Sequence, residues 1–281
     1  MWQHTPVSIR GWLLLACGGF GATYLVGEFF GSPLLPSAEL FAWGSLAACL
    51  VVAGDEAPGR VRLALGAGVV ILGSLAALPL LSTVDGNASG LSYAWTAAPR
   101  RTTLDAVTDA VRTAAPVLVG YVCLALATLF LPGRRTRAGT AVAVAGAGIA
   151  VTYAGLVIWS HDAEPAFVLA ALPPLIVAVL AFLVAGRVSR RLSTAGLVLL
   201  GLATLVLLSD VLDHVWVFPS GDAFLQPGMS TYYTEAVLLP ASAPFFATWS
   251  VAPALKLAAA ATITAGCLHQ APSPTPPPDT R

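Results

Sequence analysis

Residues 194–217 read TAGLVLLGLATLVLLSDVLDHVWV, and this stretch decides the fold class. It is long enough to cross a bilayer, since a transmembrane helix needs about 20 predominantly apolar residues. Near its end, Asp210, Asp213 and His214 follow one another at i, i+3 and i+4, so a helix places them on one face. The stretch therefore predicts a transmembrane helix that carries a dense ionisable cluster at one end.

The rest of the chain has the same apolar character. Of its 281 residues, 57% are hydrophobic and only 10% are charged, and the mean hydropathy is +0.81. A soluble domain carries about 25% charged residues, so most of this surface must face lipid. We predict an all-α, polytopic transmembrane helix bundle of about eight spans, forming one unit over residues 1–268. The expected spans are 12–30, 38–54, 63–81, 114–132, 139–160, 166–186, 194–217 and 249–268.

Arginine predicts the orientation of these spans. Ten arginines fall on one side of the threading and three on the other. Under the positive-inside rule the richer side is cytoplasmic, so both termini are expected inside the cell. We therefore expect a multi-pass protein of a prokaryotic plasma membrane. The ten are Arg10, Arg60, Arg62, Arg134, Arg135, Arg137, Arg187, Arg190, Arg191 and Arg281, and the three are Arg100, Arg101 and Arg112.

The segments outside the spans differ in character. In the outer loop 82–113, the spacing of Leu104, Val107 and Val111 predicts a short amphipathic helix lying on the membrane surface. The apolar stretch 231–248 is broken by prolines, which favours an interfacial or re-entrant segment over a full crossing. The proline-rich end, 269–281, is expected to be a disordered cytoplasmic tail.

The spacing of the spans also suggests an internal duplication. The first four predicted spans and the last four start at nearly constant offsets, which divides the bundle into halves 1–132 and 139–268. Since each half has four crossings, the two copies would run parallel, related by an axis along the membrane normal.

Several classes of function find no support in the sequence. The formal net charge is zero, which argues against a nucleic-acid partner. No nucleotide-binding loop, Gly-x-Ser-x-Gly elbow or His-Glu-x-x-His helix occurs, so no catalytic motif is found and enzymatic activity stays undecided. The four cysteines fall in hydrophobic segments without Cys-x-x-Cys spacing, which indicates buried thiols.

The only lysine, Lys256, is expected within the last span. If the seventh span meets the outer interface near Val217, Asp210 lies about 10 Å below it, and Lys256 lies at a similar depth. An unpaired charge would cost roughly 2.5–3.5 kcal/mol at the centre of a membrane helix. We therefore predict an Asp210–Lys256 pair, with Asp213 as the alternative acceptor. The pair can simply fix the packing of the two helices, or it can form part of a binding site.

A metal or haem site is a second interpretation of the same region. Asp210 and His214 have the spacing of two ligands on one helix face, and His161 is a candidate third ligand. A haem held between His161 and His214 is a further alternative. Ordinary solvated loop residues would also explain His161, Asp162 and Glu164, which together with Glu28 and Glu39 make the outer face rich in carboxylate and imidazole.

Three functional hypotheses follow from these patterns. The leading one is a carrier or channel for a small solute or ion, with Asp210, Asp213, His214 and Lys256 near an outward-facing site. The second is a membrane enzyme or redox-assembly factor that holds metal or haem at its outer face. The third is a structural scaffold. The lipid bilayer is the one partner that the sequence specifies, and the identity of any cofactor stays open.

Overall fold

A computed structural model describes residues 9–30, 35–53, 58–84, 103–131, 136–160, 165–188, 191–216 and 247–268. Within these residues the chain is all-helical, with eight helices and no strand. The helices are α1 (Ile9–Phe30), α2 (Leu35–Val52), α3 (Gly59–Val84), α4 (Thr103–Leu129), α5 (Arg137–Ser160), α6 (Pro165–Ala185), α7 (Arg191–Trp216) and α9 (Ala247–Leu268). Their positions confirm the eight predicted helical segments to within a few residues at most ends.

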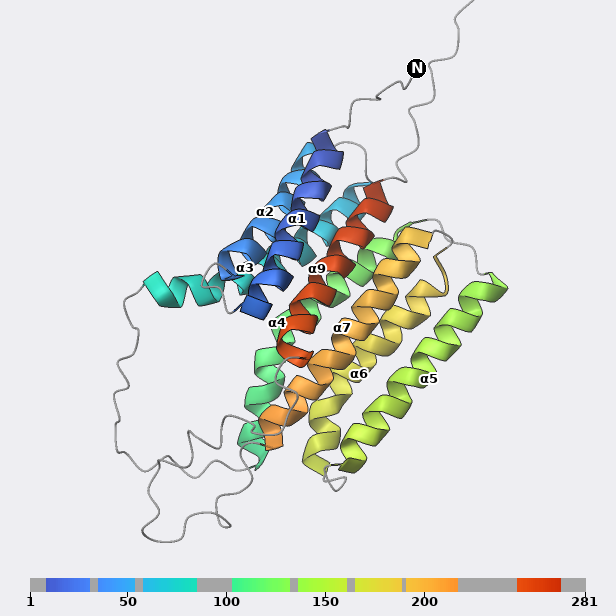
Figure 1. The fold of residues 1–281 in the computed structure, drawn as a ribbon. Coiled ribbons are helices and arrows are strands. Elements are labelled where there is room, and N and C mark those ends of the chain that lie inside the picture. The colour runs from blue at the N-terminus through green and yellow to red at the C-terminus, as the bar shows by residue number, and fades with distance from the viewer. Residues whose placement is uncertain are drawn as a thin grey trace, which may run out of the picture.

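Six of these helices are long and apolar enough to cross a membrane: α1, α3, α4, α5, α6 and α7. Ser37–Val52 of α2 and Ala252–Leu268 of α9 are shorter apolar stretches in the described part. In Figure 1 the helices lie side by side in one bundle, with α5 at one edge and α1 and α2 at the other. Large apolar side chains are exposed around it, as a protein embedded in a bilayer requires.

Contacts between the helices follow a regular order. Within α1–α4, and again within α5, α6, α7 and α9, each helix packs against the next along the chain. Between the two sets, α4 contacts α6 and α7, and α9 contacts α1, α2 and α3. The helices α4 and α9 also touch each other and so link the two sets at the centre of the bundle.

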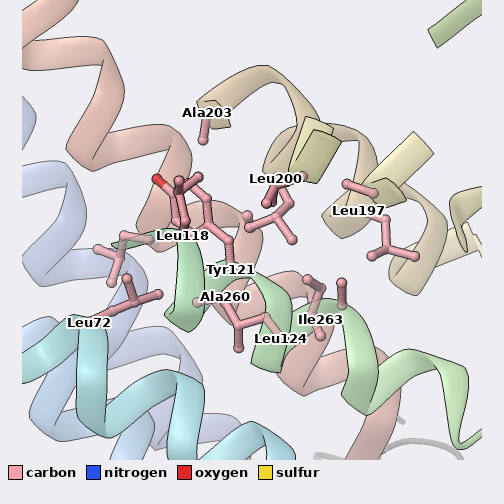
Figure 2. Close-up of a cluster of buried hydrophobic side chains, with 14 of the residues drawn as sticks. Leu72, Leu118, Tyr121, Leu124, Leu197, Leu200, Ala203, Ala260 and Ile263 are labelled. Atoms are coloured by element: carbon pink, nitrogen blue, oxygen red, sulfur yellow. The ribbon is translucent and has the colours of Figure 1, made fainter. Parts of the chain in front are cut away.

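The centre of the core lies where α4 meets α7 and α9. Figure 2 shows its buried side chains, which α4 shares with α3, α7 and α9. They include Leu72 from α3, Leu118, Tyr121 and Leu124 from α4, Leu197, Leu200 and Ala203 from α7, and Ala260 and Ile263 from α9. Since lipid tails are as apolar as these side chains, close packing must supply most of the attraction between the helices.

Glycine allows the closest of these contacts. A Cβ atom on Gly139 of α5 would lie 2.5 Å from the carbonyl oxygen of Gly186, which directly follows α6. A Cβ atom on Gly186 would likewise lie 2.6 Å from the carbonyl oxygen of Gly139. Deeper in the bundle, the Phe182 ring fits against Gly146 of α5 and Gly201 of α7. Small residues thus bring α5, α6 and α7 together where larger ones would clash.

The predicted surface helix in the outer loop is wrong as a separate element. Residues 103–112 are the first turns of α4, which continues without a break to Leu129. Val107 and Ala110 are buried, and Val111 packs against the core. The apolar face that suggested a helix lying on the membrane therefore packs against other helices instead.

Two other predictions fall outside the described residues. These are the interfacial or re-entrant segment, apart from Ala247 and Thr248 at the start of α9, and the proline-rich tail 269–281.

Gly139→Ala should destabilise the bundle by about 1–3 kcal/mol, because the new methyl group meets a backbone oxygen that cannot rotate away. The matched control is Gly148→Ala on the same helix, where a Cβ atom finds open space. Thermal unfolding in detergent measures the difference, with a thiol-reactive dye reporting exposure of the buried Cys17, Cys49 and Cys267. Equal melting temperatures for the two variants would contradict the close α5–α6 contact.

Candidate functional site

An ion pair joins α2 to α9 inside the bundle. Lys256 Nζ lies 3.0 Å from Glu39 Oε1, and their side chains are only 15% and 13% exposed. Glu39 lies in the second turn of α2, and Lys256 lies near the middle of α9. Each charge would cost several kcal/mol in a membrane helix without a partner, so the contact explains how both are tolerated.

Trp43 holds this pair from one side. It follows Glu39 by one helical turn, and its Nε1 donates a hydrogen bond of 3.3 Å to Glu39 Oε1. The Lys256 ammonium also lies 5.9 Å from the centre of the Trp43 ring, within the range of a cation–π interaction. Gly73 of α3 makes room for this ring, because a Cβ atom there would lie 3.3 Å from Trp43 Cβ.

Tyr121 and Asp210 are further ionisable residues of the helices around the pair. The Tyr121 side chain is almost fully buried in α4, and Asp210 is half-buried on α7. Both helices contact α9, which carries Lys256.

A second polar contact lies beside Asp210. The hydroxyl groups of Tyr153 on α5 and Ser209 on α7 share a hydrogen bond. Because Ser209 directly precedes Asp210, this bond fixes α7 against α5 at the level of the ionisable cluster.

The partner of Lys256 differs from the one predicted. Lys256 forms its salt bridge with Glu39 in the structure, whereas the sequence predicts Asp210. The difference arises from the start of α2. We expected the second span to begin at residue 38, which places Glu39 at the outer end of the helix. In the structure the helix begins at Leu35, and Glu39 lies inside the bundle. Glu39 and Trp43 at i and i+4 were the available signal, since their shared helix face is the one that meets Lys256.

The remaining predicted site residues are only partly visible. Asp213 and His214 lie in the last turn and a half of α7, as predicted, but their side chains are outside the described part, and so is the whole of His161. In the described part of the chain, no three His, Cys, Asp or Glu residues gather as metal ligands. The metal set of His161, Asp210 and His214 therefore stays a prediction, as does the binding role of Asp213 and His214.

No protein-family model, curated protein or solved structure matches this chain. The function must therefore be inferred from the charges and contacts of the site itself.

The ion pair can be tested with a double-mutant cycle. Glu39→Gln and Lys256→Gln should each destabilise the protein by about 3 kcal/mol, because each leaves the other charge buried without its partner. The double variant should be more stable than the sum of the two losses predicts, which gives a coupling energy of about 1 kcal/mol or more. Thermal or denaturant unfolding in detergent measures all four proteins.

The control cycle combines Asp210→Asn with Lys256→Gln and should show the smaller coupling. A larger coupling in that cycle would make Asp210 the principal partner of Lys256.

Trp43→Phe should cost about 1 kcal/mol of stability, because it keeps an aromatic ring but removes the hydrogen bond to Glu39. The same substitution in the Glu39→Gln background should cost less, since the charged acceptor is already absent. The comparison uses the same unfolding measurement, and equal costs in both backgrounds would show that the tryptophan acts only through packing.

Proposed function

We propose that this protein is a carrier for a small solute or ion in the plasma membrane of a prokaryote. Both termini would face the cytoplasm, and the Glu39–Lys256 pair would form the centre of its binding site. Asp210 would belong to the same site, with Asp213 and His214 towards its outer mouth.

The observation that carries this proposal is the place of the ion pair in the bundle. Glu39 comes from the first set of four helices and Lys256 from the last helix of the second set. In carriers built from two repeats, the substrate and the coupling ions bind at the interface between the repeats. A charged pair that crosses this interface is positioned to respond when the two halves move.

The contacts between helices support the two-repeat organisation on which this argument rests. In this organisation α1, α2, α3 and α4 correspond in turn to α5, α6, α7 and α9. The contacts of α4 with α6 and α7 then correspond to the contacts of α9 with α2 and α3. Exchanging the halves therefore reproduces these contacts, whereas the contacts of α1 with α9 and of α5 with α7 have no counterpart.

Glycine contacts follow the same correspondence. Gly68 of α3 meets Leu124 of α4, and Gly196 of α7 meets Ile263 of α9. Leu124 and Ile263 both lie five residues before the ends of their helices. The fourth helix of each set also contains a proline, Pro116 or Pro253.

The chemistry of the pair is suited to coupled binding. Separating the ion pair exposes two charges that are costly in a membrane helix, so the separated state needs a ligand charge, a proton or water to stabilise it. A solute with a charged group, or a proton on Glu39, can replace one partner in this way. Binding and the opening of the α2–α9 contact would then depend on each other.

Water access distinguishes a carrier from a scaffold. In a protein whose four native cysteines are replaced by alanine, Ala252→Cys places a thiol one turn before Lys256 on the same face of α9. A membrane-impermeant methanethiosulfonate reagent with a sulfonate group, added to intact cells, should modify this thiol if the protein is a carrier. The reaction requires a hydrated thiolate, so it reports whether water reaches the site.

The matched control is Phe41→Cys on α2, which lies close to Glu39 in sequence but is exposed on the outside of the bundle against Phe20. It should react about tenfold more slowly or not at all, because lipid surrounds it. Failure of Ala252→Cys to react, in a protein that still unfolds cooperatively, would favour the scaffold hypothesis.

A further inference from the structure

The sequence has six arginines in or next to two connections, the one before α5 and the one between α6 and α7. The connection before α5 contains Arg134 and Arg135, and α5 itself begins at Arg137. The connection between α6 and α7 contains Arg187 and Arg190, and α7 begins at Arg191. No aspartate or glutamate occurs in residues 132–161 or 165–209. The sequence therefore supplies six positive charges there without an acidic residue to neutralise them.

The structure brings three of these arginines to the same end of three neighbouring helices. The backbone contact between Gly139 and Gly186 lies two residues after Arg137 and directly before Arg187. The hydroxyl of Thr194 donates to the Val188 carbonyl oxygen over 3.2 Å, which fixes the start of α7 against the segment that follows α6. Arg137, Arg187 and Arg191 are all exposed.

Apolar side chains lie next to this charge. Val142 on α5, Leu183 on α6 and Leu192 on α7 are exposed on the helices that carry the three arginines. A surface that offers guanidinium groups beside lipid-facing aliphatic side chains matches a phospholipid, which has an anionic headgroup attached to apolar chains. A free phosphate ion or a soluble acidic protein would use only the charged part.

The positive-inside rule alone does not explain how the charge is distributed. In the connection from α2 to α3, Arg60 and Arg62 are accompanied by Asp55 and Glu56, so the charges of that connection nearly cancel. The largest group of arginines without acidic neighbours in the sequence is the one at α5, α6 and α7.

We propose that Arg137, Arg187 and Arg191 form a binding site for an anionic phospholipid of the adjoining leaflet. The guanidinium groups bind the headgroup phosphate, and the acyl chains lie along the exposed faces of α5, α6 and α7. This site lies at the arginine-rich starts of α5 and α7, whereas the Glu39–Lys256 pair joins α2 to α9, and its existence does not depend on transport.

Native mass spectrometry of the full-length protein in detergent tests this site, with phosphatidylglycerol and phosphatidylcholine as the two probes. The native protein should bind phosphatidylglycerol at least about tenfold more tightly than it binds phosphatidylcholine. Removing one arginine should weaken this binding about fivefold, so Arg137→Gln, Arg187→Gln and Arg191→Gln together should weaken it roughly hundredfold. Arg60→Gln with Arg62→Gln is the matched control and should leave it unchanged.

Additional variants and a competition with inorganic phosphate complete the test. If the triple glutamine variant does not fold, Arg187→Gln alone should still give the fivefold loss, and lysine at all three positions should preserve most of the binding. Inorganic phosphate at equal concentration should not displace phosphatidylglycerol. Unchanged lipid binding in the glutamine variants, an equal loss in the Arg60/Arg62 control, or displacement by phosphate would each overturn the proposal.

Discussion

The absence of water inside a bilayer is the constraint on which the described structure depends. Backbone groups that cannot bond to water must bond to one another, and a helix does this within its own segment. Several side-chain hydroxyls follow the same rule: Thr128 and Thr204, for example, donate to carbonyl oxygens of their own helices. The charges of Glu39 and Lys256 have no such local solution, because each is the single charged residue of its own helix and its partner must come from another helix. The ion pair therefore links distant parts of the chain, in addition to the packing of small residues against large ones.

This packing and the ion pair depend on the same helices. Gly73 leaves space for the Trp43 ring, and Trp43 donates to Glu39 and lies near the Lys256 ammonium. A larger residue at position 73 would therefore disturb the charges as well as the α2–α3 contact. Likewise, Tyr121 places a phenol within the apolar core around α4. The polar site is thus built into the centre of the bundle and is not a loop feature added to its surface.

Much of the helical architecture could be predicted from the sequence, because apolar length is a local property that single segments reveal. The eight helices are of this kind. The partner of Lys256 could not be predicted in the same way, because it depends on which helices meet and on a boundary displaced by three residues at the start of α2. Depth along neighbouring spans favoured Asp210, yet depth alone cannot distinguish two carboxylates that approach from different sides. The first turns of α4 show the same limit, since an amphipathic face fits a bundle as well as a membrane surface.

The cost of the Glu39–Lys256 pair is itself an argument about function. Replacing a buried ion pair with apolar side chains of similar size is often neutral or stabilising, so stability alone gives little reason to keep one. Asp210 adds a third ionisable group on α7, a helix that packs against α9. Several protonatable groups that share one low-dielectric environment affect each other's charge, and a ligand or proton that binds to one alters the others. The proposed carrier function rests on this capacity to exchange charge.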